Sequence, residues 1–165
     1  MRIVPSCGVC LLLLALAGCD PARVEQLEEG VATESQVRQQ FGDPVTVTVL
    51  PDGQRVLDYP RQPEGWTNYR ITIGADGKMS SLRQLLNADN FARVQPGQTQ
   101  DQVRERLGRP AATKPWELKG EVEQTWRFHP DANRSQLFSV FYDRAGRVLR
   151  TSIGDDPREQ AQAGR

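Results

Sequence analysis

The sequence predicts an α+β fold of two tandem α(α)βββ units, each with one or two helices packed on an antiparallel three-stranded meander. Three observations predict it: a helical segment with the same start and stop signals occurs twice, runs of alternating apolar and polar residues follow each copy, and a glycine-containing hairpin turn joins the last two runs. Because all three signals recur in the same order, they indicate an internal duplication. We place unit 1 at residues 26–87 and unit 2 at residues 88–154.

The repeated helix has a threonine at its start and a glycine at its end. Thr33 and Gly42 mark the first copy, and Thr99 and Gly108 mark the second copy, 66 positions later. A threonine hydroxyl can accept an unpaired backbone N–H at the helix start, and glycine tolerates the positive φ that ends a helix. Residues four apart place two apolar side chains on one face of each helix: Val37 with Phe41, and Val103 with Leu107. Residues 24–29 and 87–94 are expected to supply a first helix or a lead-in to each unit.

Three strands are expected after each helix, at residues 55–59, 69–73 and 78–82 in unit 1 and at residues 125–128, 137–142 and 147–153 in unit 2. Tight turns at 75–77 and 144–146 join the last two strands of each unit. Alternation predicts one core face for each sheet. The expected core residues are Leu57, Tyr59, Tyr69, Ile71, Ile73 and Met79 in unit 1, and Trp126, Phe128, Phe138, Val140, Tyr142 and Val148 in unit 2.

The N-terminal residues 1–18 have the pattern of a signal peptide, with Arg2 before a short apolar run and small residues before Cys19. The run is well short of the roughly 20 residues that a membrane-spanning helix needs. Leu16-Ala17-Gly18-Cys19 resembles the lipobox of bacterial lipoprotein precursors. That resemblance implies cleavage after Gly18, acyl chains (such as palmitate) on Cys19, and a lipidated tether at residues 19–25. The alternative is an ordinary secreted protein in which Cys19 has no such role.

Composition narrows the function classes. The chain has 21 basic and 21 acidic residues among its 165, and this balance argues against a nucleic-acid partner, because such proteins normally carry a basic excess on one face. The three cysteines lie at positions 7, 10 and 19, so the mature body has none left for a disulfide or a metal site. The polar residues 155–165 are expected to form a disordered tail.

The pattern Gly-x-Thr-x-x-x-Val-x-x-x-Leu-Gly-x-Pro, read directly from Gly97 to Pro110, resembles the BamE (SmpA/OmlA) family of small outer-membrane lipoproteins. The resemblance implies an α-α-β-β-β unit and an accessory role in assembling outer-membrane β-barrel proteins. A tandem pair of units also resembles the β-lactamase inhibitor protein fold, which implies two units joined into one curved sheet.

No catalytic site, metal site or cofactor is expected. His129 is the only histidine, which leaves no spacing for a zinc site, and no Gly-x-Ser-x-Gly motif is present to serve as a nucleophile elbow. The most obvious carboxylate pair, Asp155 and Asp156, lies in the expected tail. The sequence therefore favours a binding protein over an enzyme.

Six residues are candidates for partner binding. The outward face of the second sheet is expected to carry Arg127, His129, Phe141 and Leu149, an apolar centre with a polar rim. Trp66 and Trp116 lie beside prolines in expected loops, where aromatic side chains often anchor interfaces. The alternatives are that Phe141 and Leu149 pack against the other unit or a loop, and that each tryptophan caps the core of its own sheet.

These features predict a lipid-anchored protein of the cell envelope that faces the periplasm and binds an envelope protein. The partner is expected to be the outer-membrane β-barrel assembly complex, or another component of envelope maintenance. The alternative is a stand-alone inhibitor or sensor that binds through a concave sheet. The family resemblance favours the outer membrane, whereas Asp20 after Cys19 is associated with the inner membrane in enterobacterial lipoproteins.

Overall fold

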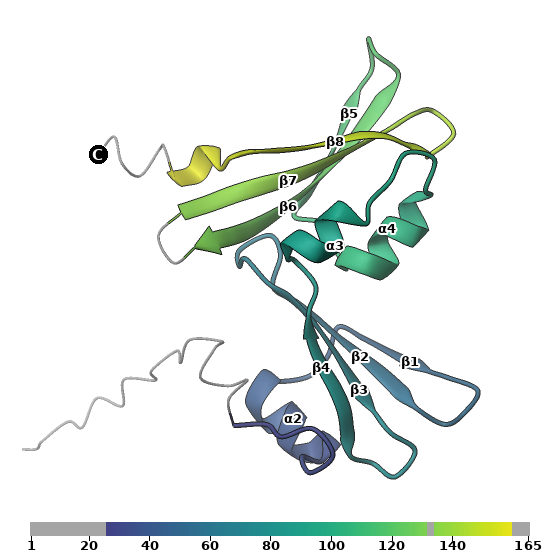
Figure 1. Cartoon of the computed structure of the whole chain (residues 1–165), viewed down its shortest axis with the longest axis vertical. Coiled ribbons are helices and arrows are strands. Elements are labelled where there is room, and N and C mark those ends of the chain that lie inside the picture. The colour runs from purple at the N-terminus through teal and green to yellow at the C-terminus, as the bar shows by residue number, and fades with distance from the viewer. Residues whose placement is uncertain (1–25, 132–133, 160–165) are drawn as a thin grey trace, which may run out of the picture.

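The computed structural model describes residues 26–131 and 134–159, which form two α+β units that each contain an antiparallel sheet. Figure 1 shows α2 against the first sheet, and α3 and α4 against the second. The elements are α2 (Glu34–Phe41), β1 (Thr46–Val49), β2 (Arg55–Pro60), β3 (Asn68–Ile73), β4 (Met79–Gln84), α3 (Ala88–Ala92), α4 (Gln100–Leu107), β5 (Ala112–Trp116), β6 (Glu121–Asp131), β7 (Arg134–Tyr142) and β8 (Val148–Asp155). The expected signal peptide and Cys19 lie outside the described residues.

Each sheet has four strands, one more than the sequence predicts. Sheet 1 has the order β1-β2-β3-β4 and sheet 2 the order β5-β6-β7-β8, with every neighbouring pair antiparallel. The additional strands, β1 and β5, lie at the sheet edges, and all of their residues are exposed. Neither strand buries a side chain, so neither contributes to the core face by which the other strands are identified, although β1 alternates threonine with valine. Pro115 fits in β5 because an edge strand tolerates a residue without an N–H.

Both repeated helices begin and end as the sequence predicts. The Thr33 side chain accepts the Gln36 N–H while the Gln36 side chain accepts the Thr33 N–H, and Thr99 and Gln102 form the same capping box in α4. Gly42 and Gly108 follow with φ of 81° and 73°. Residues 87–94 contain α3, whereas the described part of residues 24–29 contains no helix. Within residues 26–131 and 134–159, no helix is long and apolar enough to cross a bilayer.

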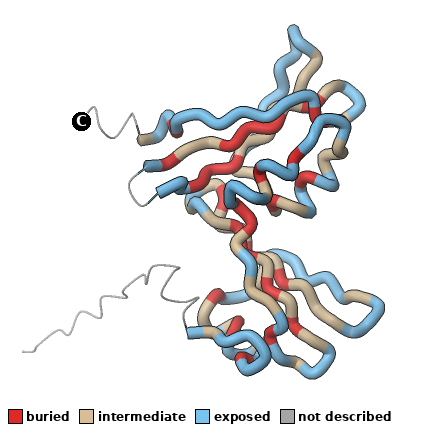
Figure 2. Tube along the Cα trace, in the orientation of Figure 1, coloured by how far each residue is buried: buried red, intermediate tan, exposed pale blue. Residues whose placement is uncertain are grey.

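The predicted core is confirmed in both units. All twelve expected core residues are buried, each with at most 7% of its surface exposed. Figure 2 shows the buried residues along the middle of both sheets and on the facing sides of the helices. They form two separate clusters, one for each unit. In unit 2, the Phe91 ring from α3 stacks on Phe138 at a centroid distance of 4.2 Å, which fixes α3 on its sheet.

The two sheets remain separate. No strand of sheet 1 is hydrogen-bonded to a strand of sheet 2, so the single curved sheet that the inhibitor-fold resemblance implies is not formed by the described strands. The units meet through side chains instead. The buried Asn68 of β3 donates to the carbonyls of Leu107 and Arg109 at 2.7 and 2.9 Å, and Arg70 donates to the carbonyl of Glu105. Unit 1 thus caps the C-terminal carbonyls of α4, which have no partner within the helix.

The C-terminal segment is ordered further than the sequence predicts. Strand β8 ends at Asp155, and Asp156 is buried with 2% of its surface exposed. Its carboxylate accepts from the Arg127 guanidinium at 2.6 Å and from the Ser135 hydroxyl at 2.8 Å. The expected tail therefore does not begin at residue 155, because Asp156 is a buried ion-pair partner. Residues 160–165 lie outside the described part of the chain.

Candidate protein-binding surface

Three of the six candidate residues lie at the junction between the units. Arg127 is only 7% exposed: it pairs with Asp156 and also donates to the carbonyl of Pro63 in unit 1 at 3.1 Å. The Gln62 side-chain amide exchanges two hydrogen bonds with the Arg127 backbone, at 2.8 and 3.2 Å. Arg127 lies on the outward face of sheet 2, as predicted, but unit 1 covers it. Its role is to hold the junction.

Trp66 packs on the other unit, in contrast to the alternative that it caps its own sheet. It lies in the loop between β2 and β3, where the sequence places it. Its ring stacks on His129 at a centroid distance of 4.4 Å, and its Nε1 donates to the Ser135 hydroxyl at 2.9 Å. His129 is consequently half of an aromatic contact between the units, as well as a residue at the edge of a cleft of about 870 Å³ beside α3. Since Trp66 remains 38% exposed, the contact is open to solvent on one side.

Hydrogen bonds stabilise the charged form of the buried Asp156 carboxyl. Burial by itself would raise the pKa of the Asp156 carboxyl, but the Arg158 N–H, the Ser135 hydroxyl and the Arg127 guanidinium together lower that pKa. The carboxylate therefore stays ionised next to Arg127 at neutral pH.

The other three candidates lie elsewhere on unit 2, away from this junction. Phe141 pairs with Glu123 on β6 and with Arg150 on β8, and Glu123 pairs with Lys114 on β5, so these four side chains share the outward face. Trp116, two residues after Lys114, points to the same side. It lies in strand β5 and not in a loop, which corrects the sequence prediction. We call Lys114, Trp116, Glu123, Phe141 and Arg150 the outer strip.

The outer strip combines aromatic rings with flanking charges. The Lys114 ammonium lies 3.9 Å from the Trp116 ring centroid, and the Arg150 guanidinium lies 4.0 Å from that of Phe141. Trp116 also donates to the Glu123 carboxylate at 2.9 Å. These contacts hold both rings on the surface: Trp116 is 36% exposed, and the neighbouring Leu149 is 42% exposed.

Arg150, besides its contact with the Phe141 ring, is held in place by a carboxylate. It forms two hydrogen bonds to Glu121, at 3.0 and 2.8 Å. Hydrogen bonding by Arg150 lowers the pKa of the Glu121 carboxyl, and the same bond raises the pKa of Arg150. Both groups are therefore charged over the physiological range.

The equivalent face of unit 1 is different. At an offset of 69 residues, Thr72 occupies the place of Phe141 and Ser81 that of Arg150, and these two are paired across β3 and β4. The core positions of the two units are apolar in both, whereas these outward positions differ, so the aromatic strip is specific to unit 2.

Among the described residues, no group of three or more His, Cys, Asp or Glu side chains is placed to hold a metal ion.

Comparisons with known proteins give only distant structural likenesses. No protein-family model matches the chain, so the resemblance to the BamE family is not supported, and no curated protein matches it in sequence. A DUF4309 family protein (YjgB) from Bacillus subtilis is similar in structure, with 15% identity, a TM-score of 0.32, and coverage of 81% of this chain and 85% of that one. A putative β-lactamase inhibitor protein from Streptococcus mutans is similar at 13% identity and a TM-score of 0.32, with 75% and 83% covered.

Proposed function

We propose that this protein acts by binding another protein through the outer strip of unit 2. The observation that carries the proposal is the exposure of Trp116 and Leu149 near Phe141, on a part of the outward face away from Arg127 and the junction with unit 1. Aromatic residues with few rotatable bonds, surrounded by charges, are enriched at protein interfaces. Neither ring belongs to the core of unit 2, so a role in folding does not account for the strip.

The proposal places the protein on a membrane of the cell envelope, facing the periplasm. The lipobox-like segment ending at Cys19 supports this location, because acyl chains on that cysteine would tether the folded units to one leaflet. The outer membrane is the favoured site. Replacing Cys19 with Ala should move the protein from the membrane fraction to the soluble or precursor fraction. A processed form that stays with the membrane would contradict the lipid anchor without affecting the binding surface.

The partner is proposed to be an envelope protein, either a component of outer-membrane β-barrel assembly or a single protein that this chain inhibits or senses. Cross-linking of the full-length protein in its own envelope, followed by pull-down and mass spectrometry, separates the two. Enrichment of several barrel-assembly proteins would indicate an accessory subunit. Enrichment of one other envelope protein would indicate a stand-alone binding module, and no specific enrichment would contradict protein binding.

A substitution pair tests whether the outer strip makes the contact. Phe141→Thr introduces the residue that unit 1 carries at the same place, so folding should be preserved. Loss of a central aromatic contact of about 1.4 kcal/mol or more lowers affinity at least about tenfold. Val49→Thr is the matched control, because Val49 is an exposed residue on β1 of unit 1. Equal recovery of the partner by both variants would show that the contact lies elsewhere.

A further inference from the structure

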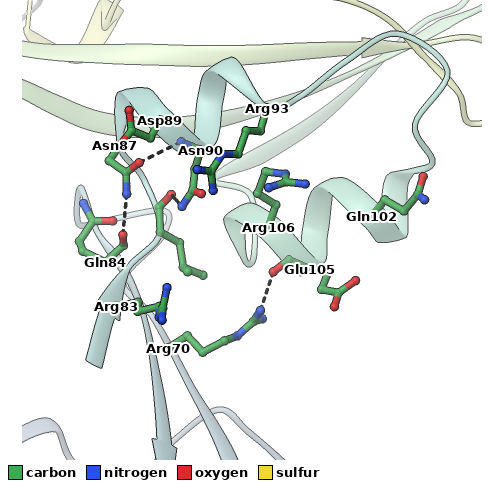
Figure 3. Close-up of a pocket in the computed structure, with 11 residues that line it drawn as sticks. Arg70, Arg83, Gln84, Asn87, Asp89, Asn90, Arg93, Gln102, Glu105 and Arg106 are labelled. Atoms are coloured by element: carbon green, nitrogen blue, oxygen red, sulfur yellow. Dashed lines mark hydrogen bonds between the residues drawn. The ribbon is translucent and has the colours of Figure 1, made fainter. Parts of the chain in front are cut away.

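An arginine-lined cleft lies where β3 and β4 of unit 1 meet α3 and α4 of unit 2. It encloses about 650 Å³ and shares no lining residue with the outer strip. Figure 3 shows that its arginines come from four different elements or their ends: Arg70 from β3, Arg83 from β4, Arg93 from the end of α3 and Arg106 from α4. Two carboxylates, Asp89 and Glu105, also line it. The lining thus has four positive and two negative groups, a formal excess of two positive charges.

Arg70 is already paired within the protein. Arg70 donates to both oxygens of Asp58, at 2.7 and 3.3 Å, and to the Glu105 carbonyl. Its charge is neutralised by Asp58, which lies outside the cleft. Arg83 lies directly opposite Arg70 on the adjacent strand, and like charges in that position destabilise a sheet.

Three guanidinium groups in the cleft have no such partner. The side chains of Arg83, Arg93 and Arg106 make no hydrogen bond or ion pair with any residue in the described part of the chain. The Nε of Arg106 is buried and has no acceptor there. A buried donor without an acceptor is costly, and more so when it is charged. The arrangement therefore carries an electrostatic cost that an anion in the cleft would relieve.

The chemistry of the cleft indicates which anion fits. A guanidinium presents parallel N–H donors that match the oxygens of phosphate or carboxylate. A single carboxylate offers one charge and two oxygens, whereas a phosphomonoester offers up to two charges and three terminal oxygens, enough to serve three arginines. The volume is within the range of small-molecule sites, with room for an organic group beyond the phosphate. We propose that this cleft binds an organic phosphomonoester, with Arg83, Arg93 and Arg106 as its phosphate ligands.

The test is calorimetric titration of the full-length protein in detergent micelles with two probes. Glycerol 3-phosphate represents a water-soluble phosphomonoester, and short-chain phosphatidic acid represents the same group on a lipid. Saturable binding of glycerol 3-phosphate would support the proposal and indicate a soluble ligand. Binding of phosphatidic acid alone would support the proposal and indicate a lipid headgroup as the ligand. Absence of saturable binding by both probes would overturn it.

Variants and pH make the test specific for the cleft and for phosphate. Arg106→Gln should weaken binding at least tenfold, whereas Arg104→Gln, the same charge change on α4 outside the cleft lining, should change it less than twofold. Binding should tighten between pH 5.5 and 7.5, because the second pKa of a phosphomonoester is about 6 while arginine stays protonated. Equal losses for the two variants, or equally tight binding of succinate with no change over that pH range, would refute the assignment. Thermal unfolding of Arg106→Gln checks folding: because Arg106 has no partner, its replacement should not lower the melting temperature.

Discussion

Gly108 ends α4 in a conformation that suits only glycine, and it also lies against Asn68 of unit 1. Its φ and ψ of 73° and −161° cost a residue with a side chain about 1–3 kcal/mol. A Cβ at this position would lie 3.0 Å from Nδ2 and 3.3 Å from Cβ of Asn68. Asn68 would have to move and weaken its two bonds to the α4 end, each of which contributes about 0.5–1.5 kcal/mol. Gly108→Ala should therefore lower the free energy of unfolding by about 2–6 kcal/mol.

Gly42 provides the matched control, because it ends α2 with nearly the same φ and ψ, 81° and −163°. A Cβ there would have no atom within 4 Å, so Gly42→Ala should cost only the backbone term of about 1–3 kcal/mol. The difference between the two variants then measures the contact with Asn68. In an Asn68→Ala background, which removes Nδ2 and the two hydrogen bonds but keeps Cβ, the cost of Gly108→Ala should fall toward that of Gly42→Ala in the native protein.

Urea unfolding followed by tryptophan fluorescence and far-ultraviolet circular dichroism is a suitable assay. Trp126 is fully buried, and its Nε1 donates to the Gly108 carbonyl at 3.1 Å, so its contribution to the emission of the three tryptophans changes when this site unfolds. Equal costs for the two glycine variants in the native background would refute the role of Asn68. An unchanged cost of Gly108→Ala after removal of Asn68 would refute it independently.

Three further predictions concern the junction and the core. Asp156→Asn leaves Arg127 buried without its counter-charge and should cost about 3–5 kcal/mol at neutral pH. Because the folded protein lowers the pKa of Asp156, the stabilising effect of this carboxylate is present above the unfolded-state pKa of about 4 and is lost as the pH falls through the folded-state value. The difference in free energy of unfolding between the native protein and the variant, measured with urea, should therefore shrink in acid. A difference that stays constant with pH would contradict the ion pair. Trp66→Ala should lower the free energy of unfolding by about 1–3 kcal/mol through loss of its ring stack and its hydrogen bond across the units, and unchanged unfolding would exclude that contact in solution. Leu107→Ala should lower the free energy of unfolding by about 2–5 kcal/mol because Leu107 is fully buried, whereas Leu149→Ala should lower it by less than about 0.5 kcal/mol because Leu149 is exposed. Similar unfolding midpoints for these two variants would contradict the assigned core.

The elements that bury a side-chain face could be predicted from the sequence. The Tyr69–Ile71–Ile73 alternation identifies β3 and its buried side, and Thr99 with Gly108 brackets α4. The edge strands β1 and β5 could not be found from a buried face, since neither of them buries a side chain. A signal was present in β1 all the same: Thr46–Val49 alternates threonine with valine, and all four residues are β-branched, which favours a strand before the turn.

The candidate surface was harder to predict than the fold, because a residue's strand position gives its face but not what covers that face. Arg127 and Phe141 both point outward from sheet 2, yet the loop at Gln62 and Pro63 covers only Arg127. That loop lies 65 residues away in the chain, and no local pattern links the two. The same limit applies to Arg106, whose neighbours in the cleft come from β3, β4 and α3. Its place on α4 alone shows only a charged residue near a helix end.

The duplication explains why the junction diverged while the cores stayed alike. At an offset of 69 residues, Arg127 of unit 2 occupies the place of Asp58 in unit 1, so one outward position carries opposite charges in the two units. Asp58 finds its counter-charge on the adjacent strand, in Arg70, whereas Arg127 takes its own from Asp156 beyond β8. Core positions must stay apolar to bury a sheet face, but outward positions are free to change sign once the chain supplies a new partner. Outward residues of this kind therefore distinguish the units: they supply Arg127 to the junction, Arg70 to the arginine-lined cleft and Phe141 to the outer strip.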